Sequence, residues 1–350
     1  MHRRRFMRQL SATAMAWPLL SQGQRSSRGK RLGVSIASYR RGRHFFSEGH
    51  PAWQNALDVL EHCKSLDAGC LQIGVRGWTR DFAGQVRARR EALDIRLEGQ
   101  VSLPRNASEL EDFDATVRHA KEAGARILRT VCLGGRRYET FKSLEAWHTF
   151  RKQSWDALVM AERIVSKYGV RLAVENHKDW RMNEQLDLLE RLSSASVGVC
   201  FDFGNNLSLL EDPHVQLKAL APYVMTTHLK DMGVQEYEGG FLLSEVPLGE
   251  GMLDLKALCH TCEQSFPEVQ FNLEMITRDP LKIPVWTDAY WITMQALRAS
   301  ELAKIMALVK KRASKKPLPT VSDKTKEEQL AYEEANVRAC FRYAQTQLGL

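Results

Sequence analysis

Short apolar runs alternate along the chain with longer stretches in which apolar residues recur at helical spacing. A short apolar run bounded by polar and turn residues is typical of a buried strand, and the longer pattern is typical of an amphipathic helix. The short runs predict eight strands, at Leu32–Ala37, Cys70–Val75, Leu97–Val101, Ile127–Cys132, Arg171–Glu175, Val197–Phe201, Val224–His228 and Gln270–Met275. The helical pattern predicts helices between them, including Trp53–Ser65, Ala107–Glu122, Leu144–Lys167, Asn183–Leu192 and Leu253–Gln264.

Eight strand–helix units within about 250 residues are typical of a (β/α)8 barrel. A doubly wound open sheet is the alternative. When such a sheet binds a dinucleotide, a GxGxxG turn follows its first strand, whereas Gly33 is followed here by Val34–Ala37. We therefore predict an α/β protein with a TIM barrel.

Apolar residues recur at helical spacing beyond the eighth predicted strand. The pattern predicts one helix over residues 286–311 and, after a break at Lys315–Pro319, a second helix over residues 323–348. We expect both helices to pack on the outside of the barrel, with a homo-oligomer contact as the alternative. The chain then divides into an export signal and linker at residues 1–30, a barrel at residues 31–300 and a C-terminal helical extension at residues 301–350.

The net charge of the chain is unevenly distributed. The 350 residues are 44% hydrophobic and 26% charged, which is typical of a globular protein. Residues 1–30 contain seven arginines and lysines and no acid, so they account for most of the net charge of +8. Because the remaining chain is nearly neutral, we expect no nucleic-acid partner. Because there is no uncharged apolar run of about 18 residues, we expect no membrane span.

The first twenty residues have the pattern of a secretory signal. A basic segment at Arg3–Arg8 is followed by a short, mildly apolar segment at Leu10–Leu20. Adjacent arginines shortly before Phe6 and Met7 resemble the twin-arginine pattern. We therefore expect the twin-arginine export machinery to be a partner and the mature protein to be periplasmic or secreted. A disordered basic tail is the alternative.

An acid or a histidine stands at the end of each of the last four predicted strands. These residues are Glu175, Asp202, His228 and Glu274. The carboxyl ends of barrel strands converge on one mouth, where active sites lie. Three carboxylates buried together need a compensating charge, and a divalent cation bound by three carboxylates and one imidazole supplies it. We therefore predict one metal site formed by these four residues. Helix caps or ion pairs are the alternative.

Side chains two residues apart on a strand share a face. His177 therefore shares a face with Glu175, and Lys230 shares one with His228. We expect His177 and Lys230 to lie one layer farther out in the mouth, where the oxygens of a substrate would be. Arg278, which follows the last strand, is a further candidate for contact with a substrate anion, and a surface arginine is the alternative.

The motifs around these residues resemble those of the xylose isomerase-like TIM barrels over about residues 31–300. They are Glu175-Asn-His177, Asp202-Phe-Gly-Asn205, His228-Leu-Lys-Asp231, Pro247-Leu-Gly-Glu-Gly251 and Glu274. The superfamily includes sugar isomerases, ketose 3-epimerases, hydroxypyruvate isomerase, inosose dehydratase and endonuclease IV. The resemblance implies that Glu175, Asp202, His228 and Glu274 bind one Mn, Mg, Co or Zn ion. It also implies that Glu175 and Glu274 form the acid/base pair.

Asn205 departs from one family pattern. Ketose 3-epimerases carry a histidine at this position that contacts the substrate, whereas Asn205 can bind a hydroxyl but cannot titrate near neutral pH. We therefore expect Asn205 to bind substrate. The asparagine at this position gives no support for a ketose 3-epimerase in particular. Endonuclease IV needs further histidines on strands two, three and six, where this chain has Arg76, Ser102 and Asn205.

Two carboxylates beside one metal ion suit chemistry on a hydroxyketone. The metal acidifies the C–H beside the carbonyl, and one glutamate removes that proton to give a cis-enediolate. Reprotonation gives an epimer or an isomer, and elimination gives a dehydratase or a lyase. We therefore predict a metal-dependent sugar isomerase or epimerase acting on a keto-sugar or related carbohydrate. The alternatives are a dehydratase or lyase on 3-keto-glycosides or inosose-like substrates, and a non-catalytic sugar-binding barrel.

Overall fold

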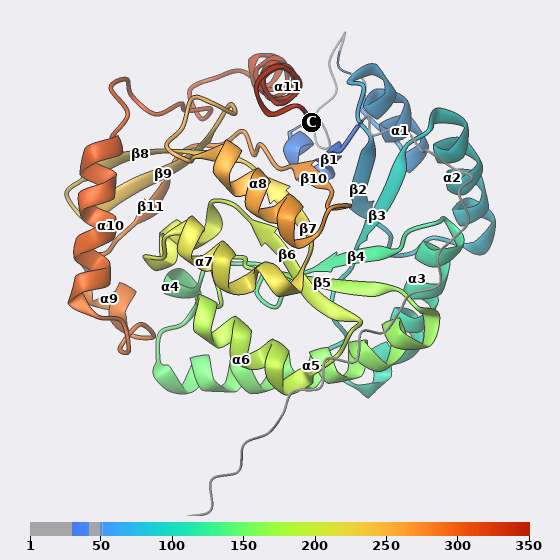
Figure 1. Cartoon of the computed structure of the whole chain (residues 1–350), viewed down its shortest axis with the longest axis horizontal. Coiled ribbons are helices and arrows are strands. Elements are labelled where there is room, and N and C mark those ends of the chain that lie inside the picture. Colours follow the sequence, from blue (N-terminus) through green and yellow to red (C-terminus); the bar gives the residue numbers. More distant parts are fainter. Residues whose placement is uncertain (1–29, 42–49, 51) are drawn as a thin grey trace, which may run out of the picture.

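The computed structural model describes residues 30–41, 50 and 52–350. Its centre is a closed barrel of eight parallel strands in the spatial order β1-β10-β7-β6-β5-β4-β3-β2 (Figure 1). The barrel strands are β1 (Leu32–Ser35), β2 (Cys70–Gly74), β3 (Arg96–Gln100), β4 (Ile127–Thr130), β5 (Arg171–Glu175), β6 (Val197–Asp202), β7 (Val224–Leu229) and β10 (Phe271–Leu273). The predicted fold class is confirmed. The predicted export signal and linker lie outside the described residues, apart from Lys30.

Amphipathic helices follow the barrel strands and surround them (Figure 1). They are α1 (Ala56–Ser65), α2 (Arg80–Leu93), α3 (Leu110–Glu122), α5 (Leu144–Tyr168), α6 (Met182–Leu192), α7 (Pro213–Leu220) and α8 (Leu255–Ser265). In α5, the buried residues Leu158, Ala161 and Val165 form an apolar stripe toward the strands. The helix begins where the Ser143 hydroxyl accepts a hydrogen bond from the Ala146 amide at 3.1 Å.

Short helical turns complete the connections. They are α4 (Arg137–Thr140), η1 (Ile36–Tyr39), η2 (Ala107–Glu109), η3 (Asn205–Leu209) and η4 (Ala221–Tyr223). None of the helices in the described part of the chain is long and apolar enough to cross a membrane.

A second, antiparallel sheet lies beside the barrel mouth. Its order is β11-β9-β8, with β8 (Asp231–Tyr237), β9 (Gly240–Val246) and β11 (Leu281–Ile283). Helix α10 (Ala299–Arg312) packs against β8 (Figure 1). This sheet has its own hydrophobic core, which includes Met232, Val234, Phe241, Ile305 and Val309. The strand patterns in the sequence analysis did not include this sheet.

The predicted helix over residues 286–311 is wrong in its first half. Only α9 (Asp288–Trp291) is helical there, and α10 begins at Ala299. The carbonyl of Thr293 accepts a hydrogen bond from the Arg137 side chain at 2.6 Å. This carbonyl is therefore bonded to a side chain and not to the backbone amide that would continue a helix. The side chain of Glu301 then accepts from the Arg298 amide at 2.9 Å and caps the start of α10.

The last helix belongs to the same hydrophobic core as the barrel. Helix α11 (Lys326–Tyr343) lies within the predicted range 323–348 and continues as a π-helical turn at Ala344–Leu348. Its buried residues Val337 and Phe341 belong to the core that the barrel strands form. It packs against η1, and the π-helical turn packs against α8. We infer that α11 stabilises the barrel itself.

We predict that Phe341→Ala lowers the free energy of unfolding by about 3–5 kcal/mol, because it leaves a cavity in the barrel core. Arg342→Ala, at the neighbouring exposed position, is the control and should change this free energy by less than about 0.5 kcal/mol. Urea denaturation followed by circular dichroism measures both. Equal stability of the two variants would show that α11 is peripheral to the barrel.

Candidate metal centre

Four polar side chains converge at the carboxyl ends of neighbouring barrel strands. Glu175 ends β5, Asp202 ends β6, His228 lies near the end of β7, and Glu274 directly follows β10. Across the sheet, Asp202 is in register with His228, which brings their side chains to the same level. Each of the four residues offers one ligand atom, and these atoms all lie within 4.8 Å of one another. The structure thus brings the four predicted ligands together, and that they bind a metal stays a prediction.

His228 is held so that one ring nitrogen faces the carboxylates. Its Nε2 lies 2.7 Å from Gln72 Oε1, and the amide nitrogen of Gln72 donates to Glu98 Oε2 at 3.1 Å. Because Gln72 therefore presents its oxygen, His228 Nε2 carries a proton. Burial opposes a charge on His228, but its neighbours Cys200, Glu274 and Glu175 raise its pKa well above the usual value, so Nδ1 is protonated as well until a metal takes the place of that proton. His228 Nδ1 then points to Glu175 Oε2 and Glu274 Oε1, each at 3.2 Å. An imidazole fixed in this way from behind is the usual arrangement of a metal ligand.

Two buried atoms in the cluster fit a cation. His228 Nδ1 and Asp202 Oδ2 are buried, and each faces charged groups: Nδ1 faces the carboxylates of Glu175 and Glu274, and Oδ2 lies 2.7 Å from Lys230 Nζ. Three carboxylates buried around one imidazole need positive charge among them, and Lys230 lies at only one edge of the group. Both atoms belong to the same four-residue cluster, and carboxylate oxygen and imidazole nitrogen are ligands for Mg, Mn, Co or Zn. The donor set therefore fits a divalent cation.

Arg129 on β4 forms an ion pair with Glu175. Burial opposes the charge of Glu175, but Arg129 and then His228 outweigh it and hold the pKa of Glu175 well below its usual range. The other carboxylate oxygen of Glu175 accepts from Asn205 Nδ2 at 2.9 Å. Glu175 is therefore ionised and fixed in position. The sequence analysis missed Arg129, although a lone charged residue within an apolar strand was a detectable signal.

Lys230 contacts two carboxylates of the cluster directly. Its Nζ is 2.7 Å from Asp202 Oδ2 and 2.6 Å from Glu274 Oε2. Burial opposes the charge of Glu274, yet His228 and then Lys230 hold its pKa well below the usual range. For Asp202, burial prevails over the neighbouring Lys230 and raises the pKa. Lys230 therefore already compensates part of the negative charge.

The hairpin of β8 and β9 contributes a fourth carboxylate to the mouth. Glu245 on β9 makes a bidentate ion pair with Arg278, at 2.5 and 3.0 Å, and lies 3.9 Å from Lys230 Nζ. The sequence analysis missed Glu245, because it did not predict the hairpin. Arg278 thus lies at the mouth with a carboxylate partner, and its predicted contact with substrate stays a prediction.

His177 and Asn205 lie close to Glu175. His177 Nδ1 is 2.9 Å from the carbonyl oxygen of Leu133. Burial is the main cause that lowers the pKa of His177 to about 4, so the ring is neutral at neutral pH. Besides bonding to Glu175, Asn205 accepts a hydrogen bond from Lys178, a residue that the sequence analysis did not select. The predicted substrate contacts of His177 and Asn205 stay predictions.

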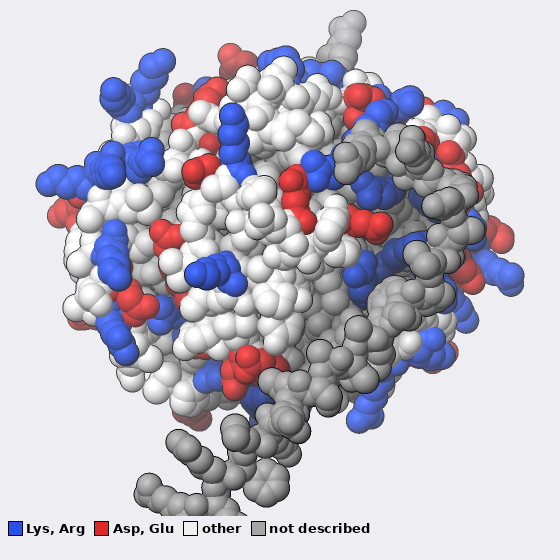
Figure 2. All heavy atoms as spheres, in the orientation of Figure 1, with Lys and Arg blue, Asp and Glu red and all other residues white. Residues whose placement is uncertain are grey.

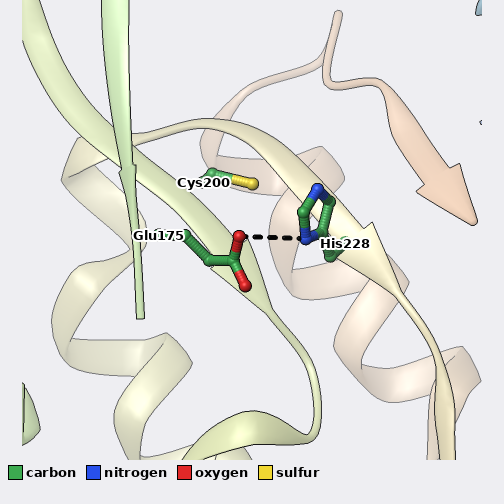
Figure 3. A group of neighbouring side chains, drawn as sticks. All are labelled: Glu175, Cys200 and His228. Atoms are coloured by element: carbon green, nitrogen blue, oxygen red, sulfur yellow. Dashed lines mark ion pairs between the residues drawn. The ribbon is translucent and has the colours of Figure 1, made fainter. Parts of the chain in front are cut away.

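Cys200 lies next to the cluster, in register with Glu175 on the neighbouring strand. Figure 3 shows its thiol above Glu175 and beside His228. Burial raises the pKa of Cys200 to about 11, so the sulfur remains a protonated thiol at neutral pH. Since metals bind the thiolate form, the oxygen-rich set with Asp202 and Glu274 is the better cation site.

Asp231 has a structural role. Its carboxylate accepts hydrogen bonds from the backbone amides of Gly249, Gly251 and Leu253 at 3.0–3.1 Å. The motif Pro247–Gly251 is therefore a loop fixed to the start of β8.

The sequence of residues 99–299, which is more than half of the chain, matches the family described as xylose isomerase-like TIM barrel. The chain belongs to this family.

Two curated relatives match parts of the chain. One is 3-oxo-isoapionate decarboxylase from Pectobacterium atrosepticum, 33% identical over 97 residues, which cover 27% of this chain and 35% of the relative. The other is the uncharacterized protein YihM from Escherichia coli, 26% identical over 172 residues, which cover 49% of this chain and 48% of the relative. The chain thus matches half or less of the length of these relatives.

Solved structures with low sequence identity share the fold. D-psicose 3-epimerase superposes with a TM-score of 0.59 at 10% identity, covering 91% of this chain and 99% of the epimerase. A barrel protein from Mycobacterium smegmatis in complex with magnesium gives a TM-score of 0.54 at 12% identity, with 80% and 96% covered. The IOLI protein with a zinc atom gives 0.53 at 15% identity, with 79% and 98% covered.

We predict that Gln72→Met weakens binding of Mn²⁺ by about 10–100-fold, because His228 then loses the acceptor that fixes its ring. Isothermal titration of chelator-treated protein measures the affinity. Gln153→Met, at an exposed position, is the matched control and should bind like the wild type. Unchanged affinity of Gln72→Met would show that the bond from His228 to Gln72 has no part in presenting Nδ1.

Proposed function

We propose that this chain is a divalent-metal-dependent isomerase or epimerase that converts a carbohydrate hydroxyketone through a cis-enediolate. One observation carries the proposal. Ligand atoms of Glu175, Asp202, His228 and Glu274 lie within 4.8 Å of one another, and all four residues are buried. Membership of the xylose isomerase-like family supports it.

The four ligands would hold the cation at the carboxyl mouth of the barrel. When bound, a divalent cation supplies positive charge beside the carbonyl and hydroxyl oxygens of the substrate, which acidifies the adjacent C–H. Asn205 and Lys230 border the cluster and donate hydrogen bonds to its carboxylates. They are therefore placed to orient the hydroxyl groups of a substrate next to the reacting carbons.

Glu175 and Glu274 are placed to carry the proton. They belong to β5 and to the end of β10, and β6 and β7 separate these strands in the barrel. The two carboxylates therefore approach the centre of the mouth from different sides. One carboxylate accepts the proton from the substrate carbon and can return it to the neighbouring carbon. The other, once it has taken up a proton from water, can deliver that proton to the opposite face. This arrangement serves both epimerisation and isomerisation.

A second candidate is decarboxylation of a 3-oxo sugar acid. The similarity to 3-oxo-isoapionate decarboxylase favours it, as do the basic side chains Arg129, Lys230 and Arg278 at the mouth. In this reaction the bond to the carboxylate breaks, carbon dioxide leaves, and the electron pair forms the enediolate, which is then protonated. The same two glutamates would handle the proton, and the reaction differs from isomerisation only in the bond that breaks.

We also propose that the protein is exported, as the basic and apolar pattern of residues 3–20 indicates. An exported enzyme would meet neutral sugars, keto-sugars and sugar acids more often than sugar phosphates.

We predict that the purified protein binds about one divalent ion per chain and releases it to EDTA. Elemental analysis by mass spectrometry measures the metal before and after chelation. Asp202→Asn is the informative variant, because it removes a charged ligand while keeping nearly the same volume, and it should reduce the metal content at least tenfold. Full metal content in this variant would contradict the assigned site.

We predict that Glu175→Gln and Glu274→Gln each abolish turnover, because an amide cannot accept the proton. The assay is a screen of keto-sugars and 3-oxo sugar acids for isomer formation or release of carbon dioxide. Run in deuterium oxide, it should place deuterium on a substrate carbon. The exposed Glu190→Gln is the control and should keep wild-type activity. Turnover without deuterium incorporation would contradict the enediolate.

A further inference from the structure

Lys178 is a buried cation without an ion-pair partner. It is 3% exposed, on the loop that follows β5. Its Nζ donates a hydrogen bond to the neutral oxygen Asn205 Oδ1, and no carboxylate of the described residues forms an ion pair with it. A buried ammonium is unfavourable unless an anion compensates it. Burial, followed by the neighbouring charges of Lys230 and Arg278, lowers the pKa of Lys178 to about 8.

The other buried cations of the mouth all have carboxylate partners. Arg129 pairs with Glu175, Lys230 with Asp202 and Glu274, and Arg278 with Glu245. Charges of opposite sign also lie near one another at the surface: on the face shown in Figure 2, basic and acidic side chains of the described residues are interspersed. Lys178 therefore differs from its neighbours in the mouth in having no carboxylate of the described residues in contact with it, although Glu245 and Asp202 counter its charge in part.

Bound metal would give the mouth an excess of positive charge. With His228 neutral, as a metal ligand is, four carboxylates of the contact network face the four cations Arg129, Lys178, Lys230 and Arg278. A dication adds two positive charges to this balance. Two further buried carboxylates, Glu98 and Asp179, have pKa values that burial raises, that of Asp179 to about 7, so they offset the added charge only in part. The site with its cation thus favours an anionic occupant.

Lys178 lies close to the predicted reacting centre. Asn205 bonds to Lys178 through Oδ1 and to Glu175 through Nδ2, so a single side chain separates the ammonium from a predicted metal ligand. The backbone of Lys178 is in the left-handed region, with φ of 63°, which side-chain-bearing residues adopt rarely. Its carbonyl accepts from the Arg137 amide at 3.0 Å, which helps to hold this conformation. Such strain is often found at functional sites.

We propose that Lys178 binds an anionic group of the substrate, a carboxylate or a phosphate, placed a few bonds from the hydroxyketone. This inference rests on the proposed function, because it takes the hydroxyketone to lie at the four-ligand cluster. It narrows the substrate class to sugar acids or sugar phosphates. Asn205 then bridges the anion site and Glu175.

Three small hydroxyketones test the proposal by isothermal titration into the metal-loaded protein. Dihydroxyacetone is neutral, hydroxypyruvate adds a carboxylate, and dihydroxyacetone phosphate adds a phosphate. The wild type should bind at least one anionic probe about tenfold or more tightly than dihydroxyacetone. Tighter binding of hydroxypyruvate would identify the anionic group of the substrate as a carboxylate, and tighter binding of dihydroxyacetone phosphate would identify it as a phosphate. Equal affinity for all three probes would overturn the proposal, whatever the variants do.

Lys178→Met should remove the preference for the anionic probe and leave the affinity for dihydroxyacetone unchanged. Lys178→Arg retains the charge and should keep most of the preference. Lys152→Met, at an exposed position, is the matched control and should behave like the wild type. If Lys178→Met is unstable by thermal melting, Lys178→Gln replaces it. A folded variant without the charge that still prefers the anionic probe would overturn the proposal.

The same titrations separate this inference from the proposed function. After EDTA treatment, the binding of dihydroxyacetone should be lost, since the hydroxyketone would be bound through the cation. If dihydroxyacetone binding is insensitive to EDTA, the proposed function fails. If it is sensitive but no anionic probe is preferred, the proposed function stands and the role of Lys178 fails.

Discussion

The mutual repulsion of buried carboxylates is the constraint on which the site depends. Glu175, Asp202 and Glu274 lie around His228 because the carboxyl ends of parallel barrel strands meet at one mouth. Three carboxylates out of water are stable only with positive charge among them. Arg129 and Lys230 supply part of that charge from the protein itself. His228 Nδ1, which faces the carboxylates of Glu175 and Glu274, marks the place where a cation would supply the rest.

The surrounding structure positions this cluster from two directions. From inside the barrel, Glu98 orients the amide of Gln72, which in turn orients the ring of His228. Barrel interiors are usually filled by branched apolar side chains, so polar residues at this level are a departure that serves the site. From outside, the antiparallel sheet brings Glu245 to Lys230 and Arg278. The antiparallel sheet is thus part of the mouth, and it has a hydrophobic core of its own.

Much of this architecture could be predicted from the sequence, and the exceptions have physical reasons. Strand-end positions were sufficient to predict that Glu175, Asp202, His228 and Glu274 converge, because strand direction in a barrel determines where side chains meet. The antiparallel hairpin was missed because a single residue, Lys230, separates β8 from β7. The helix over residues 286–311 was predicted from the spacing of apolar residues alone. Its first half is not helical, and there the Thr293 carbonyl accepts a hydrogen bond from the distant side chain of Arg137. The unpaired charge of Lys178 depends on tertiary contacts, which no local pattern contains.

The central claim is that a single cation belongs among the four converging side chains. Anomalous X-ray diffraction from crystals grown with Mn²⁺ tests it most directly. The account predicts one strong anomalous peak, at about 2.0–2.6 Å from oxygens of Glu175, Asp202 and Glu274 and from Nδ1 of His228. No peak at this position, with Lys230 still bridging Asp202 and Glu274, would show that the protein's own cations balance the site and would contradict the account.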